Sequence, residues 1–196
     1  DKGKPKAGGF EIAALGLDLF GQGEFTADGK PIAKQRINKS GRGDWATYAG
    51  YTFGYNHPVF SKRVHDILTA IACAQKDPIA AEEVWLIGWD GAGHWAAAAR
   101  AQAGAAIQRA FIHTDGFRFA KLTESDDPDF LPGAAKYLDL PGMLALSAPH
   151  SLHVAVELPD VVRAAYRAAG AEKNLVGGQQ DPDRLDPFSS PPGLNR

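Results

Sequence analysis

A turn between two apolar segments constrains the fold of this chain most strongly. Residues 84–87 are apolar, an alanine-rich stretch begins near His94, and the motif Gly88-Trp89-Asp90-Gly91-Ala92 joins them. A short apolar run that ends at glycine predicts a buried strand, whereas the alanine run predicts a helix narrow enough to pack flat on a sheet. Only a tight turn fits between the two. The motif therefore predicts that Asp90 lies at the carboxyl end of a central strand.

Length and composition indicate one globular domain. The chain has 196 residues, of which 44% are hydrophobic and 22% charged, as is ordinary for such a domain. Its 21 basic and 23 acidic side chains give no electrostatic argument for nucleic-acid binding. No apolar stretch reaches the length of a bilayer, so we expect no membrane span. The single cysteine, Cys73, excludes an intramolecular disulfide, and its apolar neighbours predict a buried thiol.

The remaining pattern alternates between strand and helix. Helical spacing covers residues 58–74 and 94–103, and a further helix begins at Asp160, which we expect to cap it, and ends at Gly170. The predicted strands are residues 10–19, 84–88, 110–114 and 174–176, with one more at 143–146 or, better supported, at 151–156. Strands separated by helices predict an α/β fold, with a mostly parallel sheet and helices on both faces. We expect the domain to occupy residues 1–176 and residues 177–196 to form an extended or flexible tail.

The first predicted strand bears on association. Residues 10–19 are apolar on both faces of a strand, and no earlier strand precedes them to pair with their free edge. An exposed edge of unpaired backbone groups is rarely tolerated in water. We therefore expect this edge to pair with another copy, with another chain, or with a segment outside this sequence.

The acidic turn supports a catalytic interpretation. It is similar to the nucleophile elbow G-x-S-x-G, with Asp90 in place of serine. A carboxylate can act as a nucleophile there if a histidine then activates water. Asp115, at the end of the next predicted strand, is the candidate acid, and His150 and His153 are the candidate bases. No histidine follows residue 153, although the third member of such a triad is expected after the last strand.

Two other interpretations of the same turn remain open. Gly91-Ala92-Gly93-His94-Trp95-Ala96 fits the dinucleotide pattern G-x-G-x-x-A, and Asp115 stands about where a ribose-binding acid belongs. Against this, Asp90 would place a carboxylate beside a pyrophosphate. In the structural interpretation, the glycines permit the turn and Asp90 caps the helix by accepting from its first amides.

Five segments carry a family resemblance. They are Asp-Leu-Phe-Gly-Gln-Gly-Glu at 18–24, Tyr-Thr-Phe-Gly-Tyr-Asn at 51–56, Arg-Val-His-Asp-Ile-Leu-Thr-Ala-Ile at 63–71, Asp-Gly-Phe-Arg-Phe at 115–119 and Leu-Pro-Gly-Ala-Ala-Lys-Tyr at 131–137. Together they resemble bacterial acetyl-xylan-esterase-like α/β-hydrolase proteins, most of all the degenerate C-terminal hydrolase module of the two-module members. The resemblance implies a hydrolase-type sheet, a secreted or periplasmic parent protein and a carbohydrate ester as the parent's substrate class. Asp90 maps to the nucleophile position, and no residue maps to the catalytic histidine.

These observations lead to one functional expectation with two alternatives. We expect a partial α/β-hydrolase-type domain, incomplete at its N-terminus and without a complete triad, in a structural, substrate-holding or partner-binding role. The first alternative is an active ester hydrolase that uses Asp90 or a nucleophile from a partner. The second is a dinucleotide-binding domain. We expect no cofactor or metal, no nucleic acid, a protein partner at the N-terminal strand edge, and a carbohydrate ester as the candidate small ligand.

Overall fold

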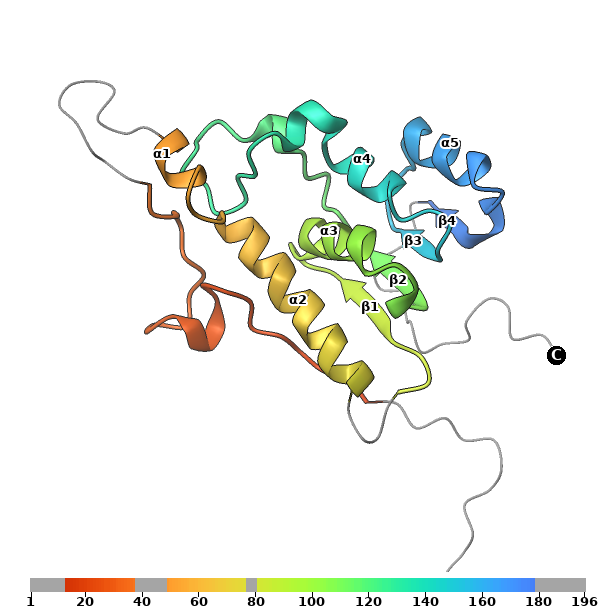
Figure 1. The fold of residues 1–196 in the computed structure, drawn as a ribbon, viewed down its shortest axis with the longest axis horizontal. Coiled ribbons are helices and arrows are strands. Elements are labelled where there is room, and N and C mark those ends of the chain that lie inside the picture. Colours follow the sequence, from red (N-terminus) through yellow and green to blue (C-terminus); the bar gives the residue numbers. More distant parts are fainter. Residues whose placement is uncertain (1–12, 38–48, 77–80, 179–196) are drawn as a thin grey trace, which may run out of the picture.

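The described strands form one parallel sheet. The computed structural model describes residues 13–37, 49–76 and 81–178. The strands are β1 (Trp85–Gly88), β2 (Arg109–Ile112), β3 (Leu152–Val154) and β4 (Leu175–Gly177), and they lie in sequence order with every neighbouring pair parallel. The prediction of an α/β fold with a parallel sheet is confirmed at this level (Figure 1).

The helices form one row beside the sheet. The α-helices are α1 (Ala49–Phe53), α2 (Val59–Lys76), α3 (Gly93–Ala103), α4 (Asp139–Ala145) and α5 (Asp160–Ala168). Short 3-10 helices cover Gly23–Phe25, Gly104–Ala106, Phe119–Lys121, Ala134–Tyr137 and Glu172–Asn174. α3 packs on β1 and β2, α2 and α4 pack against α3, and α5 packs against α4. Figure 1 shows α2 beyond β1, on the side away from β2. No helix in the described part of the chain is long and apolar enough to cross a bilayer.

The two helices predicted from spacing are confirmed, and their small or apolar faces are buried. In α2, Phe60, Val64 and Ile67 are buried at helical spacing. In α3 the alanines at 96–99 are all buried, which lets the helix lie close to the sheet. A Cβ atom at Gly88 would overlap the side chain of Ala96, so glycine is needed where β1 meets α3.

The later elements also follow the predicted order. The segments predicted as strands at 110–114, 151–156 and 174–176 contain β2, β3 and β4, whereas residues 143–146 lie in or just after α4. α5 begins at Asp160 and its chain turns at Gly170, as predicted. The predicted cap is wrong, because no side chain caps the N-terminus of α5.

The two faces of the sheet differ, which corrects the prediction that helices cover both. Leu86, Ala110 and Leu152 point toward the helices, and Ala110 and Leu152 are buried there. The opposite face consists of the alternate residues of the strands. We call it the open face, and it is formed by Trp85, Ile87, Arg109, Phe111, His153 and Val176. All six are partly or largely exposed, and the helices of the described residues lie on the other side.

The predicted first strand is a second correction. Residues 13–19 have no strand structure, and residues 13–18 are exposed. Residues 10–12, the start of that prediction, lie outside the described residues. Among the described residues the sheet thus begins at β1, so the turn that follows β1 ends an edge strand there and not a central one. The reason is that a strand needs a neighbour, and none of the described residues pairs with residues 13–19.

Two smaller predictions concern Cys73 and the C-terminal tail. Cys73 lies on α2 but is exposed, so the predicted buried thiol is wrong. Apolar neighbours in sequence do not fix which side of the helix a residue occupies. Of the predicted tail, Gly177 belongs to β4 and residues 179–196 lie outside the described residues.

Candidate functional site

The elbow turn, residues 89–92, places Asp90 on the predicted tight turn between a strand and a helix, although that strand is at the edge of the sheet. The amide of Ala92 donates to the carbonyl of Trp89 at 2.9 Å, which closes a β-turn between β1 and α3. Asp90 has φ 48° and Gly91 has φ 85°. Two successive positive φ values bend the chain sharply, and aspartate tolerates this conformation better than most residues. The side chain of Asp90 is therefore held on a tight, exposed turn.

Asp115 is brought to the same turn from the next strand. It follows β2 with φ 50°, and its Oδ2 accepts a hydrogen bond of 2.9 Å from the amide of Gly91. Its Oδ1 lies 2.8 Å from Nδ1 of His113. Asp115, the candidate acid, thus contacts the elbow turn, because parallel strands end at the same edge of a sheet.

His113 is the imidazole that the sequence analysis missed. It directly follows β2, its ring lies 6.1 Å from that of Trp89, and Asp115 holds its Nδ1. The signal was present, because a histidine two residues before a candidate acid shares the carboxyl end of the same strand. The chain order of a triad instead predicts a base after the last strand, and His113 comes before it. No hydrogen bond or ion pair joins the carboxylate of Asp90 to an imidazole in the described residues.

The two predicted bases lie elsewhere. The Nε2 of His150 is 3.8 Å from the position of a Cβ on Gly104, just after the last residue of α3. The elbow turn is at the other end of that helix, about 16 Å away for eleven residues. His153 lies within β3 with its ring 5.0 Å from that of Phe111, on the open face. Burial and the nearby Arg109 lower the pKa of His153. Neither histidine is brought to Asp90 as a base.

The turn also bears on the other two interpretations. No side chain caps α3, whose N-cap residue is Ala92, so the predicted cap by Asp90 is wrong. The amide of Gly91, which a phosphate would need, already donates to the carboxylate of Asp115. Gly93, the second glycine of the dinucleotide pattern, does allow a close approach of the chain, because a Cβ there would overlap the carbonyl of His113. Within the described residues no three His, Cys, Asp or Glu side chains converge to hold a metal ion.

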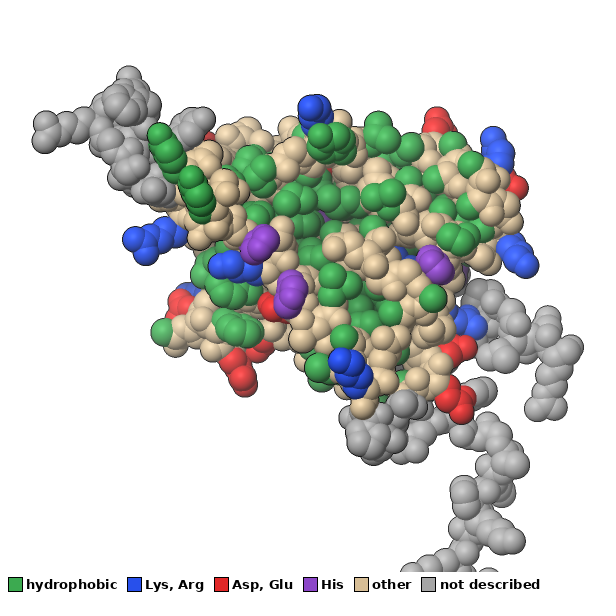
Figure 2. Space-filling view, in the orientation of Figure 1, with side chains coloured by type: hydrophobic (Ala, Val, Ile, Leu, Met, Phe, Trp, Pro, Cys, Tyr) green, Lys and Arg blue, Asp and Glu red, His purple; other side chains and the backbone are tan. Residues whose placement is uncertain are grey.

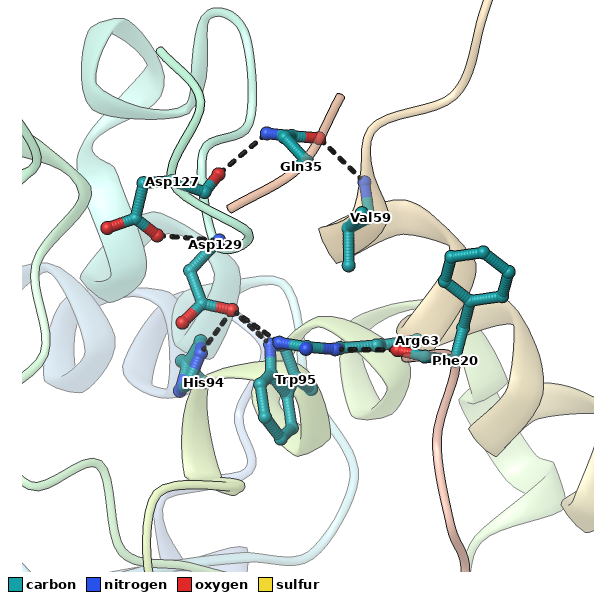
Figure 3. A network of polar contacts seen from close by, with 8 residues as sticks. All are labelled: Phe20, Gln35, Val59, Arg63, His94, Trp95, Asp127 and Asp129. Carbon is teal, nitrogen blue, oxygen red and sulfur yellow. Dashed lines mark hydrogen bonds and ion pairs between the residues drawn. The ribbon is translucent and has the colours of Figure 1, made fainter. Parts of the chain in front are cut away.

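A buried polar cluster lies beside α2 and α3, on the helix side of the molecule (Figure 3). We call it the Asp129 cluster, made of Arg63, His94, Trp95 and Asp129. One oxygen of Asp129 accepts from Trp95 Nε1 at 2.8 Å and from Arg63 Nη1 at 3.2 Å, and His94 Nε2 lies 3.2 Å away. The Arg63 side chain is 3% exposed and lies 4.5 Å from the centre of the Trp95 ring. A single carboxylate thus ties a loop to two helices.

The charges of this cluster support one another. Burial alone would raise the pKa of Asp129, but the contacts from His94 and Trp95 and the charge of Arg63 outweigh it, so the pKa lies below its ordinary value. Burial lowers the pKa of Arg63, and Asp129 opposes that shift. Gln35 extends the network, since it donates to the carbonyl of Asp127 at 2.6 Å and accepts from the amide of Val59 at 3.1 Å. The polar groups of the cluster thus contact one another and the neighbouring loops, as in a network that stabilises the fold.

The surface gives no strong charge signal. On the side seen in Figure 2, hydrophobic side chains gather over the centre and acidic and basic side chains are scattered around the rim. The formal net charge of the whole chain is −2. Patches of one sign would be expected for a nucleic-acid surface.

Comparisons with known proteins do not assign a family. No family model, no curated protein and no solved structure matches this chain.

Proposed function

We propose that this chain is a hydrolase-type α/β module without a working triad, which holds a partner or a substrate and does not turn it over. Its resemblance to acetyl-xylan-esterase-like proteins suggests a carbohydrate ester as the substrate class and a secreted or periplasmic location for the parent protein. One observation carries the proposal. The elbow turn presents Asp90 on an exposed turn, and no hydrogen bond or ion pair joins its carboxylate to an imidazole of the described residues.

The chemical reason is that an aspartate nucleophile needs a second group. Its attack on the acyl carbonyl of an ester expels the alcohol and leaves a mixed anhydride, which water must cleave with the help of a base. His150 and His153 are not placed to supply that base. The bond between Asp115 and Gly91 stabilises the turn and leaves no open amide at that position for a developing oxyanion.

The test is hydrolysis of a nitrophenyl acetate by the purified chain, beside Asp90→Asn and a matched control. Glu157→Gln is that control, because Glu157 is an exposed carboxylate outside the elbow turn. We expect all three proteins to show the same background rate. A rate that falls at least tenfold in Asp90→Asn and not in Glu157→Gln would overturn the proposal.

One observation favours the alternative of an active ester hydrolase. Asp115 holds Nδ1 of His113, which is how a carboxylate orients a catalytic imidazole in a triad. If turnover is found, His113→Ala should abolish it and His153→Ala should not. Loss in His153→Ala alone would exclude His113 as the base.

A further inference from the structure

Residues 13–18 form an apolar segment with an unpaired backbone. Leu15 and Leu17 are 73% and 42% exposed. No backbone hydrogen bond joins residues 13–18 to another described residue. Apolar side chains and backbone donors and acceptors are thus both open to solvent in one segment, which is the state of a strand that lacks its neighbour.

The outer edge of β1 is unpaired in the same way. The amides of Gln108 and His113 donate to the carbonyls of Val84 and Gly88, each at 2.9 Å. Alternate residues of a strand face alternate neighbours, so the backbone groups of Trp85 and Ile87 point away from β2. None of the described residues pairs with them, and the Ile87 side chain is 41% exposed. This edge carries no charge or proline that would block pairing.

Both segments are attached to the same layer of helices. The amide of Phe20 donates to Asp66 at 2.8 Å and Arg63 donates to the carbonyl of Phe20 at 3.1 Å, which fixes the end of residues 13–19 to α2. α3 packs on both α2 and β1. In Figure 1, α2 passes between residues 13–19 and β1, and the two segments run in the same direction. α2 therefore overhangs the space next to the edge of β1.

The overhang argues against a second copy of this chain at the edge. Antiparallel pairing of β1 with its counterpart, about a twofold axis normal to the sheet, would place the second α2 on the helix side of β1, where α3 packs. Stacking two open faces is also weak, because four strands about 4.8 Å apart and about 13 Å long offer roughly 250 Å² in projection. A stable interface buries about 800 Å² on each partner. Neither arrangement would pair the edge and cover the open face together.

We propose that another polypeptide chain donates a β-strand to the space beside β1 and beneath α2, pairing with β1 on one side and with residues 13–19 on the other. The donated strand continues into a helix that covers the open face, because parallel strands are covered on both faces and a strand alone buries too little area. The donor is apolar and extended, as in other cases of strand addition. This inference rests on the proposed partner-binding role and names its surface.

The test compares hydrogen exchange in the chain alone and in the assembly isolated from its cells of origin. In the chain alone, the amides of residues 13–18, Trp85 and Ile87 exchange rapidly. In the assembly, both segments are protected together, at least a hundredfold. Leu17→Pro and Ile87→Lys each reduce the retained partner at least tenfold, whereas Leu146→Lys, at an apolar residue 70% exposed elsewhere, does not.

Three results would overturn this inference. They are slow exchange of both segments in the monomeric chain, a symmetric dimer of this chain in sedimentation, and a retained partner that protects another surface. A thermal melt of each variant confirms that it folds. Ester turnover is measured separately. Turnover with a donated strand present would contradict the proposed function alone. An unprotected edge without turnover would contradict this inference alone.

Discussion

The Asp129 cluster and the elbow turn use the same chemical groups in opposite ways. In the cluster, one half-buried carboxylate collects two side-chain donors and an imidazole from α2 and α3. At the elbow turn, Asp90 is exposed, and the neighbouring Asp115 bonds one amide and one imidazole. The contrast indicates that, among the described residues, the polar contacts of the cluster tie helices together, whereas those of Asp115 hold the elbow turn.

The largest expected effect comes from breaking the cluster. Asp129→Ala leaves Arg63 buried without its carboxylate, since the Arg63 side chain is only 3% exposed. Removing one partner of a buried ion pair costs about 3–5 kcal/mol, so we expect a loss near the lower end of this range. Urea unfolding followed by circular dichroism measures it. A loss below about 1 kcal/mol would show that the cluster does not hold the helices.

A smaller effect is expected from the glycines that flank the elbow turn. A Cβ on Gly93 would overlap the backbone carbonyl of His113, whereas a Cβ on Gly91 meets open space. Gly93→Ala should therefore lose about 2–3 kcal/mol by overpacking. Gly91→Ala should lose about 1–2 kcal/mol, because alanine is strained at φ 85°. Thermal melts of the two variants give the order, and a reversed order would contradict the close approach of α3 to β2.

Strong acid should weaken the Asp129 cluster. The pKa of Asp129 is lowered by folding, so its contribution to stability is complete above the ordinary aspartate pKa of about 3.9 and is lost as the pH falls further. We expect the unfolding free energy to fall below about pH 4, and to fall less steeply in Asp129→Asn. Parallel slopes in the two proteins would mean that other carboxylates dominate.

The smallest expected effect is at the turn itself. Asp115→Asn keeps one acceptor for the Gly91 amide, and Asp115 is largely exposed, so we expect a loss of about 0.5–1 kcal/mol. Hydrogen exchange at Gly91 should quicken while exchange in α3 is unchanged. A loss as large as that in Asp129→Ala would remove the difference between the two regions.

Local patterns predicted the elements that pack on one another. The alanine run of α3, the apolar spacing of α2 and the glycine turn at 88–92 each fix a conformation within a few residues, and the structure confirms all three. Residues 10–19 failed as a strand because pairing depends on a neighbour that a single segment does not encode. The open face was also not predicted, because the residues of a strand do not encode which elements cover them.

The candidate site was likewise predictable in some of its residues and not in others. Asp90 and Asp115 were predictable, since parallel strands bring their carboxyl ends together. His113 was within reach of that argument, but the expected order of a triad directed attention to His150 and His153. The Asp129 cluster joins Asp129 to residues 34 to 66 positions away in sequence, and no spacing rule connects Arg63 to Asp129.

The central claim is that the elbow turn carries no working nucleophile. The most direct test is incubation of the chain with a nitrophenyl acetate in heavy-oxygen water, followed by mass spectrometry of the peptide that contains Asp90. Attack of Asp90 on the acetyl carbonyl expels nitrophenolate and forms a mixed anhydride, and water that cleaves this anhydride at the aspartyl carbonyl leaves one heavy oxygen in Asp90. Cleavage at the acetyl carbonyl places the heavy oxygen in acetate and is detected as nitrophenolate release that Asp90→Asn abolishes. We predict that the Asp90 peptide keeps its natural mass. Heavy oxygen in Asp90 that disappears in His113→Ala would contradict the account and establish this chain as an active hydrolase.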